Sequence, residues 1–125
     1  MLNCKDLNEI LSQANTSGVL STFLINQRGD MVTYVGDGDA VAKARGRVIS
    51  SVWSGYEQKK PSNGPEILLN NMIISCDSGR IVVEKVADSG YLLCMFAKKI
   101  VNLGLLCAKA KAVVDFLREP LANMP

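Results

Sequence analysis

The chain has 125 residues, a formal net charge of +2 and no histidine. This length allows one domain, spanning residues 1–125, to bury a core without disulfides or metal. The net charge is too small to predict nucleic-acid binding, and the lack of histidine removes the commonest catalytic base and metal ligand. We therefore expect no catalytic site, no cofactor and no metal.

Four cysteines are present, and no two of them form a Cys-x-x-Cys pair: Cys4, Cys76, Cys94 and Cys107. Three of the four lie in apolar segments, which predicts reduced, buried thiols rather than disulfides or a zinc site. Without a histidine to activate them, Cys94 and Cys107 are interpreted as core residues and not as nucleophiles.

No apolar run approaches the ~20 residues needed to span a bilayer. The first residues are polar, and neither chain end carries a lipidation motif, so we expect no signal peptide and no lipid anchor. Any attachment to a membrane is therefore expected to run through a partner.

The first predicted element is a short helix, with Asn3 as its cap and an apolar stripe formed by Leu7, Ile10, Leu11 and Ala14. Two strands follow, at 19–26 and 31–35, and the turn between them begins at Asn26. The second strand is the more polar of the two, which predicts that it lies at a sheet edge.

A long helix is predicted over 40–56. Asp37 and Asp39 precede it and are interpreted as caps rather than as a metal or acid–base pair. Gly36 and Gly38 lack the further residues of a phosphate-binding loop, so they are interpreted as turn geometry.

The apolar residues of this helix cover an arc of roughly 200°, about twice what packing on one sheet requires. They are Val41, Ala42, Ala44, Val48, Ile49, Val52, Trp53, Gly55 and Tyr56. Two interpretations stay open, a helix set deeply in its own chain or a surface that binds a partner, and the same choice holds for Trp53 and Tyr56. The basic run Lys43, Arg45 and Arg47 is expected to be mainly a solvated face.

After a loop at 57–66, three strands are predicted at 67–76, 80–86 and 91–97, joined by short turns and therefore antiparallel. The last of them has no polar alternation, which predicts a central strand covered on both faces. Tyr91, Leu93 and Met95 should face one layer, and Leu92, Cys94 and Phe96 the other.

The last helix is predicted over 103–118, with Pro120 ending it. Its main apolar stripe fits packing on a sheet. A second, weaker stripe of Leu105, Ala112 and Phe116 lies on the opposite side, where either the first helix or a partner would cover it.

Several short stretches, in this order, carry a family resemblance: Leu11-Ser-Gln-Ala-Asn-Thr16, Gly18-Val-Leu-Ser-Thr22, Trp53 with Tyr56, Leu92-Leu-Cys-Met95 with Ala97-Lys98, and Ala108-Lys-Ala-Lys111 with Glu119-Pro-Leu121. With the order of the elements, they resemble the roadblock/LC7 family, and most closely its adaptor subunits in the Ragulator complex.

The resemblance implies an α+β fold, α-β-β-α-β-β-β-α, whose five-stranded antiparallel sheet has the order 2-1-5-4-3. Two helices would cover one face and the long helix the other. It also implies a heterodimer, in which the third strands pair edge to edge and the long helices lie side by side. The predicted interface residues are Val48, Ile49, Val52, Trp53, Tyr56, Leu68, Met72 and Ile74.

The function implied is that of a non-enzymatic scaffold, paired with a roadblock protein of the MAP-kinase-scaffold type. It would recruit Rag GTPases for TORC1 nutrient signalling and support MAP-kinase signalling on late endosomes and lysosomes. A lipidated subunit would provide the membrane anchor, and any nucleotide exchange would belong to the assembled complex. Nucleic acid and direct membrane insertion are not expected.

Two alternatives stay open. The wider roadblock family also contains other regulators of small GTPases and dynein light chains. A small-molecule sensor of PAS or profilin type would have a similar pattern of elements, because fold alone does not determine function.

Overall fold

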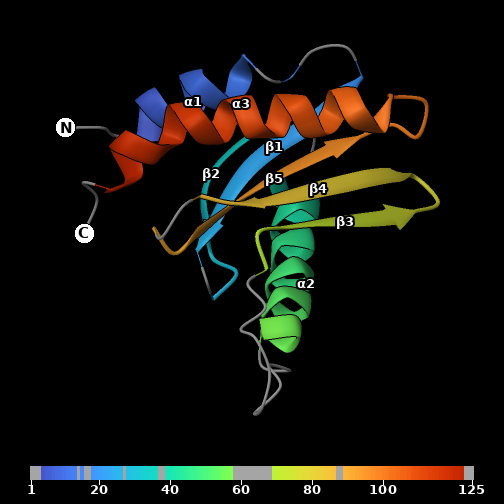
Figure 1. Ribbon diagram of the computed structural model, residues 1–125, viewed down its shortest axis with the longest axis horizontal. Coiled ribbons are helices and arrows are strands. Elements are labelled where there is room, and N and C mark those ends of the chain that lie inside the picture. The colour runs from blue at the N-terminus through green and yellow to red at the C-terminus, as the bar shows by residue number, and fades with distance from the viewer. Residues whose placement is uncertain are drawn as a thin grey trace.

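The computed structural model describes residues 4–13, 15, 18–26, 28–36, 39–57, 69–86 and 89–122. Three helices and five strands follow one another in the predicted order (Figure 1). They are α1 (Cys4–Ser12), β1 (Val19–Asn26), β2 (Met31–Gly36), α2 (Asp39–Glu57), β3 (Asn71–Cys76), β4 (Gly79–Lys85), β5 (Tyr91–Ala97) and α3 (Leu103–Ala122).

The five strands form one antiparallel sheet with the order β2-β1-β5-β4-β3. Helices α1 and α3 lie together on one face of the sheet, and α2 crosses the other face (Figure 1). The predicted α+β class, the strand order and the distribution of the helices are therefore confirmed. The polar second strand, β2, is an edge strand as predicted.

β5 is the central strand, and its side chains alternate between two separate cores. Leu93 and Met95 belong to the core beneath α1 and α3, and Tyr91 packs against its margin. Cys94 and Phe96 belong to the core beneath α2. A strand buried on both faces needs apolar side chains at every position, which explains why its sequence lacks alternation.

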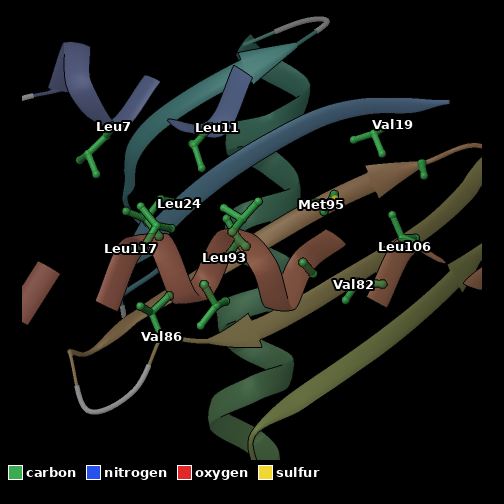
Figure 2. Close-up of a cluster of buried hydrophobic side chains, with 14 of the residues drawn as sticks. Leu7, Leu11, Val19, Leu24, Val82, Val86, Leu93, Met95, Leu106 and Leu117 are labelled. Atoms are coloured by element: carbon green, nitrogen blue, oxygen red, sulfur yellow. The ribbon is translucent and has the colours of Figure 1, made fainter. Parts of the chain in front are cut away.

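The first core, drawn in Figure 2, contains more buried residues than the second. Leu7 and Leu11 come from α1, Leu106 and Leu117 from α3, and all four side chains are fully buried. In Figure 2 these side chains point toward strand residues such as Leu93. Both helices thus use apolar stripes to cover the same face, as their sequence period predicts.

Polar side chains also hold α1 and the segment after it to this face. The Asn15 amide donates to the Val35 carbonyl at 3.2 Å, and the Thr22 hydroxyl donates to Asn15 Oδ1 at 2.7 Å. The Thr33 hydroxyl donates to Asn8 of α1. Buried polar groups need such partners, so these bonds fix the helix on the sheet with a defined register.

The second core is formed by the opposite face of the sheet and by α2. Ile49 and Trp53 are buried there against strand residues, and Phe96 belongs to the same cluster. The Arg45 guanidinium lies over the Phe96 ring, 3.9 Å from its centroid. Arg45 is therefore only partly solvated, whereas Lys43 and Arg47 are exposed as expected.

Two predicted boundaries are wrong. α3 continues through Pro120 to Ala122, because Leu121 is buried in the first core at 2% exposure and its packing outweighs the missing proline N–H. β3 begins at Asn71 rather than at residue 67, and Leu69 and Asn70 precede it outside the strand. The predicted loop lies almost wholly outside the described residues, as does Asp37 of the predicted cap.

Cys76 is also a correction, because its side chain is exposed and not buried. It lies at the last position of β3, whose outer side has no neighbouring strand among the described residues. Cys94 is buried as predicted, and Cys107 is half-buried.

Candidate interaction surface

One edge of the sheet lies beside an uncovered apolar face of α2. β3 pairs with β4 alone, so its other side has no neighbouring strand among the described residues. The Lys85 N–H donates to the Asn70 carbonyl at 2.9 Å, so Asn70 and Lys85 form a hydrogen-bonded pair of the β3–β4 ladder. In an antiparallel ladder, hydrogen-bonded pairs alternate with pairs that are not hydrogen-bonded. The backbone N–H and C=O groups of Asn71, Ile73 and Ser75 therefore point away from β4.

The exposed side of α2 is apolar next to this edge. Val48 is 61% exposed and Tyr56 65% exposed, and Val52 between them is half-buried. These residues are spaced four apart, so they form one ridge along the helix. Met72 and Ile74 of β3 point to the same face of the sheet and are themselves only half-buried. We call these five residues the α2–β3 surface.

A hollow of about 250 Å³ lies within this surface, between α2 and the strands. Its lining is almost entirely apolar and includes Val48, Ile49, Ile74 and Ile81, together with Ala44 and Arg45. Sequence reasoning missed Ile81, although strand alternation and the register place it opposite Ile74. A large apolar side chain from a partner would fit such a hollow.

The structure divides the eight predicted interface residues into three groups. Val48, Val52 and Tyr56 are exposed or half-buried on α2, Met72 and Ile74 are half-buried on β3, and Val48 and Ile74 line the same hollow. Ile49 and Trp53 are 1% and 5% exposed, so the chain's own sheet already covers them. Leu68 lies outside the described residues.

The other edge strand, β2, lies against α1. β2 carries a close contact with α1 through the Thr33–Asn8 hydrogen bond, and Asn15 caps the Val35 carbonyl. Uncovered edge strands favour association with another chain, and proteins usually block them. These side-chain bonds hold β2 against α1, whereas the outer backbone groups of β3 meet no described strand.

A scan against protein-family models found no match. A curated relative, the Ragulator complex protein LAMTOR2 homolog of Caenorhabditis elegans, is 33% identical over 127 residues, which covers 99% of this chain and 96% of the relative. The chain belongs to the roadblock family and is of the Ragulator type.

Solved structures support the roadblock fold. The roadblock/LC7 domain of Streptomyces avermitilis superimposes with a TM-score of 0.82 at 16% identity, over 93% of this chain and 98% of that domain. The gliding protein MglB of Thermus thermophilus gives a TM-score of 0.83 at 11% identity, over 97% and 92% of the two chains. At these identities the likeness concerns the fold alone.

Two features of the described part of this roadblock chain concern metal binding and thiol chemistry. It contains no group of three or more His, Cys, Asp or Glu side chains that could hold a metal ion. Burial raises the pKa of the Cys94 thiol far above its ordinary value, which keeps it protonated and unreactive. A hydrogen bond with Ser78 lowers the pKa of the exposed Cys76 thiol.

None of the described helices is both long enough and apolar enough to cross a bilayer. The weaker stripe of α3 remains open on the far face of the molecule, with Leu105 50% and Phe116 67% exposed. A shallow apolar hollow of about 180 Å³ there includes Phe116 and Ile10 of α1. Helix α1 thus borders this stripe without covering it.

Proposed function

We propose that this chain is a scaffold subunit that works by pairing with a second roadblock protein through its α2–β3 surface. The bare edge of β3 beside the exposed Val48–Tyr56 ridge carries the proposal. A partner strand added along β3 would continue the sheet, and a partner helix beside α2 would cover the ridge. The two contacts lie side by side, so one partner of the same fold meets both.

Kinship with a Ragulator protein supports the identity of the partner and the setting of the pair. We propose that the partner is a roadblock protein of the MAP-kinase-scaffold type, that the pair recruits Rag GTPases for TORC1 signalling, and that it supports MAP-kinase signalling on late endosomes and lysosomes. A lipidated subunit would hold the assembly at the membrane, and this chain would contribute binding rather than catalysis.

The side-chain contact is tested by Val48→Asp. Its matched control is Leu105→Asp, which places the same charge at an exposed aliphatic position on a helix of the opposite face. Each variant is co-expressed with the roadblock partner and purified through a tag on that partner. We expect Val48→Asp to reduce capture at least about tenfold, because a carboxylate would be buried in an apolar contact. Equal capture of both variants would overturn the α2 contact.

The strand contact is tested in the same assay with Ile73→Pro and Ile73→Thr. Proline removes an N–H that points away from β4, so the sheet of this chain keeps its own ladder while the partner strand loses a bond and meets the ring. Threonine keeps the N–H and the branched side chain. We expect proline alone to abolish stable capture. Full capture of Ile73→Pro would exclude pairing along β3.

A further inference from the structure

A second cavity lies on the α2 face of the sheet, away from the α2–β3 surface. Its volume is about 330 Å³, within the range of roughly 300–1,000 Å³ that small-molecule sites occupy. It lies where the β1–β2 turn, the end of β4 and the start of β5 meet the second half of α2. The residues that matter for its chemistry are Arg28, Ser50, Trp53, Ser54, Lys85 and Leu92.

Two cations from distant parts of the chain line this cavity. Arg28 comes from the β1–β2 turn, where its own N–H donates to Asn26 Oδ1 at 2.9 Å and anchors the turn. Lys85 ends β4, and strand alternation places it on the same face as Val83 of the second core. Both cations therefore point to one side of the sheet.

No carboxylate balances these two charges within the described lining of the cavity. Glu84, the neighbour of Lys85, belongs to the opposite face, where it is 7% exposed and feels the charge of Lys111 on α3. Asp30, which shares the turn with Arg28, lies outside the lining and accepts from the Asn26 amide at 3.4 Å. The lining that the described residues provide thus carries a net positive charge.

Helix α2 contributes two hydroxyls and an aromatic wall. Ser50 and Ser54 are one turn apart, and Trp53 stands beside them. Ser50 is 7% exposed and Trp53 5% exposed, so both lie deep in the wall. Leu92 of β5 completes an apolar patch next to Trp53.

We propose that this cavity binds a phosphate monoester with a small apolar group. Such an ester carries about −1.5 to −2 charges at neutral pH, which matches two cations, whereas a carboxylate carries one. Arginine and serine are suitable donors to its oxygens. The apolar part of the ester would lie against Trp53 and Leu92.

Partner binding through the α2–β3 surface would leave the cavity open. At roughly 100° per residue, Ser50 and Ser54 lie about 160° around α2 from Val48 and Val52, respectively. The phosphate site and the α2–β3 surface are therefore on opposite sides of the same helix. The inference does not depend on the proposed pairing, and either can fail without the other.

Trp53 is the chain's single tryptophan, so its fluorescence reports on the cavity directly. The purified full-length chain is titrated with phenyl phosphate. We expect a saturable change, and we expect Arg28→Met and Lys85→Met each to weaken binding about tenfold, since each removes a charged donor. Lys99→Met removes an exposed cation outside the cavity lining and should bind like the parent chain.

Benzoate serves as the matched ligand, with the same ring and a single charge. We expect benzoate to bind at least about tenfold more weakly than phenyl phosphate. Its single charge and two oxygens interact less strongly with the two cations than the larger charge and three free oxygens of the phosphate. No saturable change with phenyl phosphate, equal weakening by Lys99→Met, or equal binding of benzoate would overturn the proposal.

A short peptide containing phosphotyrosine distinguishes two sources of the ester. Tighter binding of the peptide than of phenyl phosphate would assign the site to a phosphorylated side chain, and the reverse would assign it to a free phosphate ester. Each result supports the phosphate-monoester site, and failure of both ligands overturns it.

Discussion

The two faces of the sheet are covered in different ways. The α1/α3 face is sealed by the leucines of two helices and by hydrogen bonds such as that from Thr22 to Asn15. On the α2 face one helix contributes Ile49 and Trp53 to the core, while Val48 and Tyr56 of the same helix stay exposed. Both layers complete a core and leave some apolar side chains exposed, but those of α2 lie next to β3, which pairs with β4 alone among the described strands.

This difference separates the buried residues that hold the domain together from the exposed residues for which we propose a partner contact. Buried leucines on the α1/α3 face stabilise the folded chain whether or not a partner is bound. The exposed ridge on α2 contributes little to the folded chain alone and becomes useful when another surface covers it. Three predictions test this separation, beginning with the largest effect.

Leu117→Ala should lower the free energy of unfolding by about 3 kcal/mol, because Leu117 is fully buried in the first core and its removal leaves a cavity. Val48→Ala should change it by less than about 0.5 kcal/mol, since the side chain is largely exposed. Urea denaturation of the isolated chain measures both. Similar losses for the two variants would contradict the difference between the faces.

Thr22→Val should lower the free energy of unfolding by about 1–3 kcal/mol, because it leaves Asn15 Oδ1 without its donor near the buried sheet. Thr22→Ser keeps the hydroxyl and serves as the control, measured by the same denaturation experiment. If valine were tolerated as well as serine, the polar bonds would not help to seal the α1/α3 face.

Glu84→Gln should have the smallest effect, and its size should depend on pH. Burial raises the pKa of the Glu84 carboxyl, an effect that the charge of Lys111 only partly opposes. A carboxyl whose pKa is higher in the folded state stabilises that state at low pH, and this contribution is lost as pH rises through the folded pKa. Glutamine does not ionise.

The variant should therefore gain stability relative to the parent chain between about pH 4, near the ordinary pKa of a glutamate, and pH 7. Urea denaturation at the two pH values measures the change. A difference between the two proteins that stays constant with pH would show that Glu84 is not desolvated under α3.

Much of the fold was predictable from local patterns. The predicted bounds of β1 and β5 are those observed, and the uniform apolar run from Tyr91 to Ala97 identified the central strand. The end of α3 was not predictable from Pro120, because the burial of Leu121 comes from residues distant in the sequence. Local rules describe what a segment favours, and packing can override them.

The candidate sites were predictable only in outline. The wide apolar arc indicated that α2 carries more apolar surface than one sheet needs. It did not predict that Trp53 is buried and Tyr56 is exposed. The cavity that joins Arg28 to Lys85 left no pattern in the sequence, because its parts come from separate turns and strands.

By itself, the sequence determined the order of the elements, the two-sided burial of the middle strand and the excess of apolar residues on α2. Only the tertiary structure decided which part of that excess is buried and which stays exposed. The physical reason is that helical periodicity sets how side chains are arranged around the helix axis, whereas the rotation of the helix over the sheet depends on contacts with residues far away in the chain.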